Sequence, residues 1–247
     1  MIAFRNLVNS LRKSSPYFLV VCFFASCTAT ELPVNQTFPS KVQIPYETKF
    51  ALSENPISEN NVWINGHAIG REWSDVQSRP GLVFSTESGK GEYRDATAIL
   101  AGAWSPNQSV QAAVHSANQN SKIYEEVEIR LRSFVSPRKV TGYEVNFRCT
   151  SDGTQYVQIV RWNGPLGKFS YIARATGPGL RDGDVVKATI LGNTISAYIN
   201  GTLVLQGTDS AFSSGNPGLG FYNEGGTPAN NSEFGFTSFR AEEIPGN

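Results

Sequence analysis

The stretch that decides the fold class is Asp184-Val-Val-Lys-Ala-Thr-Ile-Leu-Gly-Asn-Thr-Ile-Ser-Ala-Tyr-Ile-Asn200-Gly201-Thr-Leu-Val204. Apolar and polar residues alternate along it with a period of two, which is the pattern of a β-strand with one buried face. The pair Asn200-Gly201 favours a two-residue hairpin turn because both residues tolerate a positive φ. The stretch therefore predicts successive antiparallel strands over residues 185–191, 194–200 and 202–206.

The same alternation recurs over the rest of the chain beyond residue 50, where no segment shows a sustained helical period. Further predicted strands cover residues 62–65, 82–86, 96–100, 110–116, 124–134, 142–150, 156–162, 169–175, 218–222 and 234–240. About a dozen short strands at this spacing are typical of two sheets packed face to face. We therefore expect an all-β protein, a two-sheet antiparallel sandwich.

The composition agrees with this class and excludes others. Among 247 residues there are 23 Gly and 13 Pro, and charged residues make up only 17%, as in turn-rich β proteins. A hydrophobic content of 40% is too high for a disordered chain. Because 21 basic residues balance 21 acidic ones, no positive field attracts phosphate backbones, and we expect no nucleic-acid partner. The length suits one domain, over residues 49–247.

Residues 1–27 have the composition of a secretory signal peptide. Basic residues without an acid precede a short apolar run at 17–24, and small residues follow it. The run is shorter than the roughly 20 residues of a membrane span, and a membrane-anchored N-terminal helix is the alternative interpretation. We predict export. Removing the segment leaves 18 basic residues against 21 acidic ones, so the mature chain carries a net charge of −3.

The end of this segment, Phe24-Ala25-Ser26-Cys27, resembles a bacterial lipobox, in which the cysteine is lipidated and begins the mature chain. Phe24 replaces the usual leucine, and ordinary cleavage after Ala29 is the competing interpretation. Residues 28–48 are polar and punctuated by proline, as in a tether. The protein is therefore expected outside the cell, or in the cell envelope with a lipid on Cys27 as its only membrane attachment. Its oligomeric state is left open.

The opening stretch, followed by Gly218-Leu-Gly-Phe-Tyr222, resembles the concanavalin A-like lectin and glucanase superfamily, which includes laminin-G-like jelly rolls. In that superfamily a Gly-Asn turn, a strand with Tyr, an Asn-Gly turn and a Gly-x-Gly strand follow in this order. The resemblance extends over residues 50–242, nearly the whole mature chain. It implies a jelly-roll sandwich but not one activity, since the superfamily holds lectins, hydrolases, lyases and adhesion modules.

Two of the predicted strands carry polar side chains on a shared face. If the strands at 124–134 and 142–150 pair, this face holds Glu126, Glu128, Arg130, Arg132, Glu144, Asn146 and Arg148, which Gln111, His115 and Gln158 would extend. Such side chains on a concave sheet can hydrogen-bond sugar hydroxyls. The alternative is pairing of Glu with Arg across strands on a solvated face. We expect a site for carbohydrate or glycoconjugate here.

Enzymatic alternatives use the same face, with Glu126, Glu128, Arg148 and His115 as candidate catalytic residues. The laminarinase-like glucanases of the superfamily carry Glu-x-Asp-x-Glu or Glu-x-Asp-x-x-Glu. Here the second acid is Glu128 and the third acidic position is Arg130 or Leu131, which argues against hydrolysis. A polysaccharide lyase acting on a uronic-acid polymer would need Arg or amide groups at the uronate and a base such as Tyr171, Tyr198, Lys187 or His115. The Gln-x-His triplet of jelly-roll lyases is absent. A non-catalytic adhesion or structural module is a further alternative.

Aromatic residues suggest an edge of the binding site. Trp104 lies in a predicted loop and Trp162 at the end of a strand, where an exposed indole could stack on a sugar ring. The alternative is that each closes an end of the core, which is also the interpretation for Trp63 and Trp73.

No cofactor is expected, and no metal site is predicted from Cys and His spacing. The segment Asp182-Gly183-Asp184 could contribute to a structural Ca²⁺ site or simply form a tight turn. Cys149 faces inward by alternation and is expected to behave as a small apolar residue.

Overall fold

The computed structural model describes residues 37–119 and 122–246. The signal peptide predicted over 1–27, the lipidation site at Cys27 and the tether as far as residue 36 lie outside these residues. Within the described ranges, no helix is long and apolar enough to cross a membrane.

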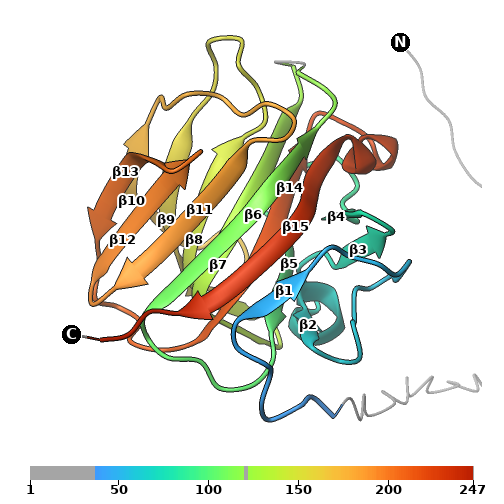
Figure 1. Ribbon diagram of the computed structural model, residues 1–247. Helices are drawn as coiled ribbons and strands as arrows, with labels where there is room; N and C mark the ends of the chain where they lie inside the picture. Colours follow the sequence, from blue (N-terminus) through green and yellow to red (C-terminus); the bar gives the residue numbers. More distant parts are fainter. Residues whose placement is uncertain (1–36, 120–121, 247) are drawn as a thin grey trace, which may run out of the picture. The chain divides into compact units, whose positions relative to one another are not determined.

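The described residues form two antiparallel sheets, stacked face to face (Figure 1). The first sheet consists of β1 (Tyr46–Thr48), β3 (Val76–Arg79), β4 (Leu82–Ser85), β6 (Gln108–Ser116), β11 (Val185–Leu191), β12 (Thr194–Ile199), β13 (Thr202–Thr208) and β15 (Phe234–Glu243). Its strand order is β13-β12-β11-β6-β15-β4-β3, with β1 paired to β15.

The second sheet consists of β2 (Trp63–Asn65), β5 (Ala96–Leu100), β7 (Tyr124–Ser136), β8 (Lys139–Arg148), β9 (Val157–Gly164), β10 (Phe169–Ala175) and β14 (Asn216–Glu224), in the order β10-β9-β8-β7-β14-β5-β2. Two short helical turns, η1 (Gly66–Gly70) and η2 (Pro228–Glu233), interrupt the strands. The predicted antiparallel sandwich is confirmed.

The opening stretch folds as predicted into β11, β12 and β13. Asn200 and Gly201 both have positive φ, 49° and 79°, as the two-residue hairpin turn requires. The Asn200 side chain also accepts a hydrogen bond from the backbone N–H of Val185, which ties the turn to the start of β11.

Strand β1 lies in the segment predicted as a tether. Tyr46–Thr48 pairs with β15, the Tyr46 hydroxyl donates to Glu59, and Val42 is buried in the core. Residues 42–48 are therefore part of the folded unit, which begins earlier than the predicted boundary at 49. The prolines around this short strand hide its alternation, so its sequence is typical of a linker.

The core lies between the sheets and follows the predicted alternation. Val127, Ile129 and Leu131 of β7 point into it, and Cys149 lies buried in the same cluster, as predicted. Trp63 also joins this core. Trp73 is buried elsewhere, in a smaller apolar cluster with Ile99, Val135, Val140, Val160 and Trp162. Because Val160 and Trp162 alternate along β9 with the core residue Ile159, this second cluster covers part of the opposite face of the second sheet.

Candidate functional site

Polar side chains occupy the face of the second sheet that points away from the core. Across β7 and β8 the register pairs Glu126 with Arg148, Glu128 with Asn146, and Arg130 with Glu144. All six are at most 6% exposed. The shared face that alternation predicts is therefore present, and the predicted Glu–Arg pairs face each other across it. The face is buried rather than solvated.

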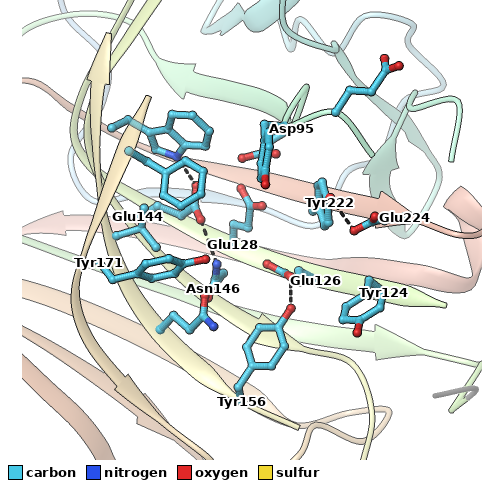
Figure 2. A pocket seen from close by; sticks show the side chains of 16 residues that line it. Asp95, Tyr124, Glu126, Glu128, Glu144, Asn146, Tyr156, Tyr171, Tyr222 and Glu224 are labelled. Atoms are coloured by element: carbon cyan, nitrogen blue, oxygen red, sulfur yellow. Dashed lines mark hydrogen bonds between the residues drawn. The ribbon is translucent and has the colours of Figure 1, made fainter. Parts of the chain in front are cut away.

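A groove of about 390 Å³ crosses this face (Figure 2). Its polar lining consists of Glu92, Asp95, Glu126, Glu128, Glu144, Asn146, Gln158 and Glu224. Six of these are carboxylic acids, and among the described residues no Lys or Arg side chain lines the groove. The surface offered to a ligand is thus rich in hydrogen-bond acceptors.

Apart from Val160, the remaining lining is aromatic: Tyr93, Tyr124, Tyr156, Trp162, Phe169, Tyr171 and Tyr222. Phe169 lies between Tyr93 and Tyr171, with ring centroids 5.3 Å from each, and 5.1 Å from Trp162. Tyr93 and Tyr171 are 51% and 44% exposed. These rings make a continuous aromatic wall whose outer members are open to a ligand.

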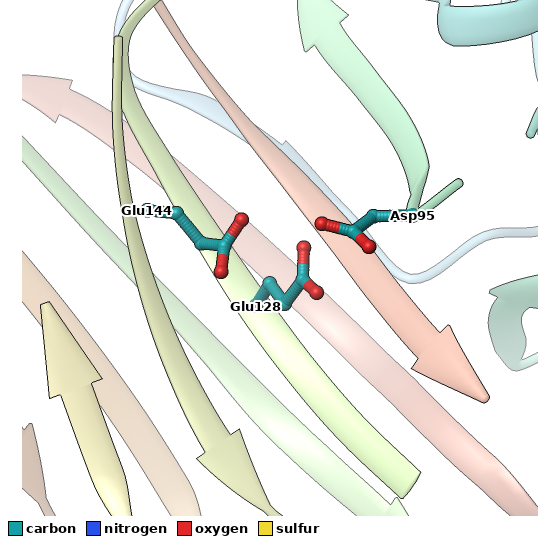
Figure 3. A group of neighbouring side chains, drawn as sticks. All are labelled: Asp95, Glu128 and Glu144. Carbon is teal, nitrogen blue, oxygen red and sulfur yellow. The ribbon is translucent and has the colours of Figure 1, made fainter. Parts of the chain in front are cut away.

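Arg130 lies fully buried beneath the groove, where it contacts three acids. Its Nη2 is 2.6 Å from Glu128 Oε2 and 3.4 Å from Asp95 Oδ2, while Nη1 is 2.7 Å from Glu144 Oε2. Figure 3 shows the three carboxylates close together, Glu128 from β7, Glu144 from β8 and Asp95 from the residue just before β5. Burial and the neighbouring Glu144 raise the pKa of Asp95 to about 7, against the lowering effect of Arg130. One cation therefore offsets only part of this acidic charge.

The carboxylates of Asp95, Glu128 and Glu144 lie within 4.8 Å of one another, a spacing that divalent cations can use. The Arg130 guanidinium already contacts all three, so it supplies positive charge where such an ion would need to sit. The residues present fit a guanidinium better than a metal. At the other candidate, Asp184 accepts from the backbone N–H of Arg181, and Gly183 has φ 84°. The tight-turn interpretation accounts for that segment.

Glu126 also lines the groove and accepts a hydrogen bond from the Tyr156 hydroxyl. Burial raises the pKa of Glu126 to about 8. Opposite it, the Arg148 guanidinium lies 4.1 Å from the ring centre of Tyr124 and 5.8 Å from that of Tyr156, and it donates to the backbone oxygen of Thr154. Arg148 therefore contacts two aromatic lining residues but does not itself line the groove.

Two buried acceptors in the lining have no hydrogen-bond partner among the described residues, Glu128 Oε1 and Asn146 Oδ1. The other polar atom of each side chain has a partner: Glu128 Oε2 pairs with Arg130, and Asn146 Nδ2 donates to Glu144 Oε1 at 3.1 Å. Trp162 Nε1 donates to the other oxygen of Glu144 at 2.5 Å. Because an unsatisfied buried acceptor costs free energy, these two fixed oxygens are natural places for a ligand to donate hydrogen bonds.

Arg132 does not belong to this face, so its predicted place in the row is wrong. The register of β7 against β8 shifts between Leu131 and Phe134, and Arg132 has φ 46°. This bulge breaks the alternation and turns the side chain away. Its guanidinium instead donates to backbone oxygens of three loops, at Pro106, Gly192 and Phe212.

The prediction that Gln111 and His115 extend the row is also wrong, because β6 belongs to the first sheet. His115 therefore lies in the first sheet, whereas the groove lies over the second, and its Nδ1 is 2.9 Å from Asp182 Oδ1. Lys187 and Tyr198 likewise lie in the first sheet, on β11 and β12. Alternation along a strand predicts which face a side chain takes, but not the sheet that the strand joins.

The two candidate tryptophans differ. Trp104 is buried in the core and donates to the backbone oxygen of Ala101, so it follows the alternative interpretation. Trp162 is buried too, yet it lines the groove. Sequence reasoning missed Asp95, Tyr93, Tyr124, Tyr156, Tyr222, Phe169, Glu92 and Glu224 as lining residues. For Tyr124 and Phe169 the period-two pattern of their strands was the available signal.

Gly220 on β14 leaves room for the buried ion pairs. A Cβ at this position would overlap Glu128 Oε2 and would lie 3.0 Å from Arg130 Nε and from the backbone oxygen of Ala96. We expect Gly220→Ala to destabilise the fold by about 1–3 kcal/mol, measured by urea denaturation, because the packed side chains must shift. Gly246→Ala is the control, since its Cβ would meet only ordinary contacts. Equal stability of the two variants would show that the ion pairs are loosely packed.

No protein-family model matches the chain, and no curated protein matches it either. Among solved structures, the carbohydrate-binding module CBM66 from Bacillus subtilis is 15% identical, covers 76% of this chain and 96% of its own, and has a TM-score of 0.51. The carbohydrate recognition domain of Emp46p in its metal-free form is 13% identical, with coverages of 80% and 96% and a TM-score of 0.52. These similarities show the fold, a concanavalin A-like jelly-roll sandwich.

Proposed function

We propose that this protein is an exported module that binds carbohydrate or glycoconjugate in the groove over the second sheet. One observation carries the proposal: exposed aromatic rings and fixed, buried acceptors line the same groove. A sugar ring has an apolar face that stacks on aromatic rings and hydroxyl edges that donate hydrogen bonds. The wall of Tyr93, Phe169 and Tyr171 beside Glu128 and Asn146 provides both.

The two structural neighbours support this proposal, since their names describe carbohydrate binding and carbohydrate recognition. At 13–15% identity the support is for a shared fold that can carry such a site. A purely adhesive or structural module would fit a flat face on which every charge is paired. A groove with unpartnered acceptors favours ligand binding instead.

The observations argue against the uronate lyase. Uronate carboxylates would meet a lining of acids, while Arg148 is engaged between two tyrosine rings and His115 lies in the other sheet. The hydrolase has no specific observation in its favour, because Glu126 is bound by Tyr156 and Glu128 by Arg130. Export by the segment at 1–27 remains part of the proposal, either with a lipid anchor on Cys27 or with free secretion.

The function is tested on a glycan array probed with the mature chain and two variants. We expect Tyr171→Ala to weaken binding to the preferred glycan at least about fivefold, the loss of more than 1 kcal/mol typical of a contact that matters. Phe134→Ala is the matched control, because Phe134 is 62% exposed but lies outside the groove lining. The proposal fails if no glycan retains the protein, or if both variants bind equally well.

A further inference from the structure

The groove contains more acidic than basic groups. Asp95, Glu126, Glu128 and Glu144 are all buried in its floor, and Arg130 is the cation that contacts three of them. Burial and the crowding of these acids raise the pKa of Glu128 well above its usual value, despite Arg130. The floor therefore has too little positive charge to keep Glu128 ionised, and a cation brought into the groove would favour the ionised form.

Other arginines near the groove are engaged with its walls. Arg148 lies against the rings of Tyr124 and Tyr156, and Arg174 lies over Tyr171, 3.2 Å from the ring centre. At the rim, Arg94 pairs with Glu92 at 2.9 Å. None of these side chains lines the groove within the described ranges, so a bound ligand meets acids and rings before it meets a guanidinium.

The unpartnered oxygens Glu128 Oε1 and Asn146 Oδ1 indicate where a ligand would donate hydrogen bonds in this acidic groove. Both are buried acceptors, both belong to side chains fixed by their other atoms, and both residues line the groove. A neutral hydroxyl can donate one hydrogen bond to such a site. A primary ammonium can donate three, accepts none, and brings the missing positive charge.

We propose that the preferred ligand is a saccharide carrying a protonated primary amine, which donates to Glu128 Oε1 and Asn146 Oδ1 while the sugar stacks on the aromatic wall. This inference rests on the proposed carbohydrate function and specifies its ligand class. The tyrosine rings around the groove also favour a cation through their electron-rich faces. A divalent metal is disfavoured because Arg130 lies 2.6–3.4 Å from the oxygens of the acidic triad.

The test is calorimetric titration of the mature chain with three oligosaccharides of equal length: oligomers of glucosamine, of N-acetylglucosamine and of glucuronic acid. At about pH 6 the amine is protonated. We expect the glucosamine oligomer to bind at least about tenfold more tightly than its acetylated counterpart, with affinity falling as salt is added, and the glucuronate oligomer to bind most weakly.

Variants connect this preference to the groove. Glu128→Gln should bring the two affinities close together, since glutamine keeps an acceptor but cannot ionise beside the ammonium. If this variant does not fold, Glu224→Gln at the exposed mouth should still reduce the preference for the amine, by a smaller factor. Glu242→Gln on β15 in the first sheet is the control and should leave the preference unchanged.

The outcomes separate the two proposals. Equal or tighter binding of the acetylated or glucuronate oligomer overturns the amine preference but leaves carbohydrate binding intact. The amine proposal is also overturned if both Glu128→Gln and Glu224→Gln still prefer the glucosamine oligomer as strongly as the wild type does. Competition of CaCl₂ with the glucosamine oligomer, at matched ionic strength, would assign the acids to a metal and overturn it too. No binding of any oligomer, with no signal on the array, would refute both proposals.

Discussion

Replacing Arg130 with methionine is expected to destabilise the protein by about 3–5 kcal/mol, because removing one partner from a buried ion pair leaves charge uncompensated. Here three carboxyl groups, those of Asp95, Glu128 and Glu144, would lose their shared cation. Urea denaturation near neutral pH measures the loss. Arg130→Lys keeps the charge but not the contacts through both guanidinium Nη atoms, so it should reduce the free energy of unfolding less than Arg130→Met does.

Arg240→Met is the matched control for this prediction. Arg240 also contacts two acids, Glu47 and Glu242, but it is 43% exposed. An exposed pair contributes at most about 1 kcal/mol, so this variant should unfold at nearly the wild-type urea concentration. If both methionine variants are equally stable, the Arg130 network is not the electrostatic centre of the site.

The second large expected effect is a loss of stability as the pH rises. The pKa of Asp95 is raised to about 7 and that of Glu126 to about 8, both chiefly by burial. A group whose pKa is higher in the folded than in the unfolded state holds its proton more tightly when folded. Its contribution is complete below the unfolded pKa of about 4 and is lost as the pH rises through the folded value, by about 1.4 kcal/mol per pH unit and group.

Urea denaturation at about pH 5 and about pH 8 tests this, the window that the raised pKa values define. We expect the wild type to be more stable at the lower pH, and Glu126→Gln to reduce the difference because it cannot ionise. Glu242→Gln serves as the control, since the pKa of Glu242 is lowered by Arg240 instead of raised. Greater stability at the higher pH, or an unchanged difference in Glu126→Gln, would contradict the buried acidic floor.

Much of the fold could be predicted from the sequence because strand alternation is a local signal. Strands β5, β10 and β11 have the predicted bounds, and β7 pairs with β8, the condition on which the predicted polar face depended. That pairing alone places Glu126, Glu128, Glu144 and Asn146 on one face of the sheet. Strand β1 was missed because three residues among prolines give too short a pattern.

The rest of the site depends on long-range packing that no local pattern contains. Asp95 and Tyr93 precede β5, which pairs with β14 and so comes beside β7 only through a third strand. His115 has the right alternation, but β6 joins the other sheet. Arg132 was misplaced by a single bulge, which reverses the side of the strand that a residue faces.

The most direct test of carbohydrate binding is a crystal structure of the mature chain with the glycan that binds best on the array. The account predicts a sugar ring stacked against Tyr93 or Tyr171, with donors directed at Glu128 Oε1 and Asn146 Oδ1. A glycan bound over the first sheet, near Gln111 and Arg240, or held only at the rim without reaching the acidic floor, would contradict it.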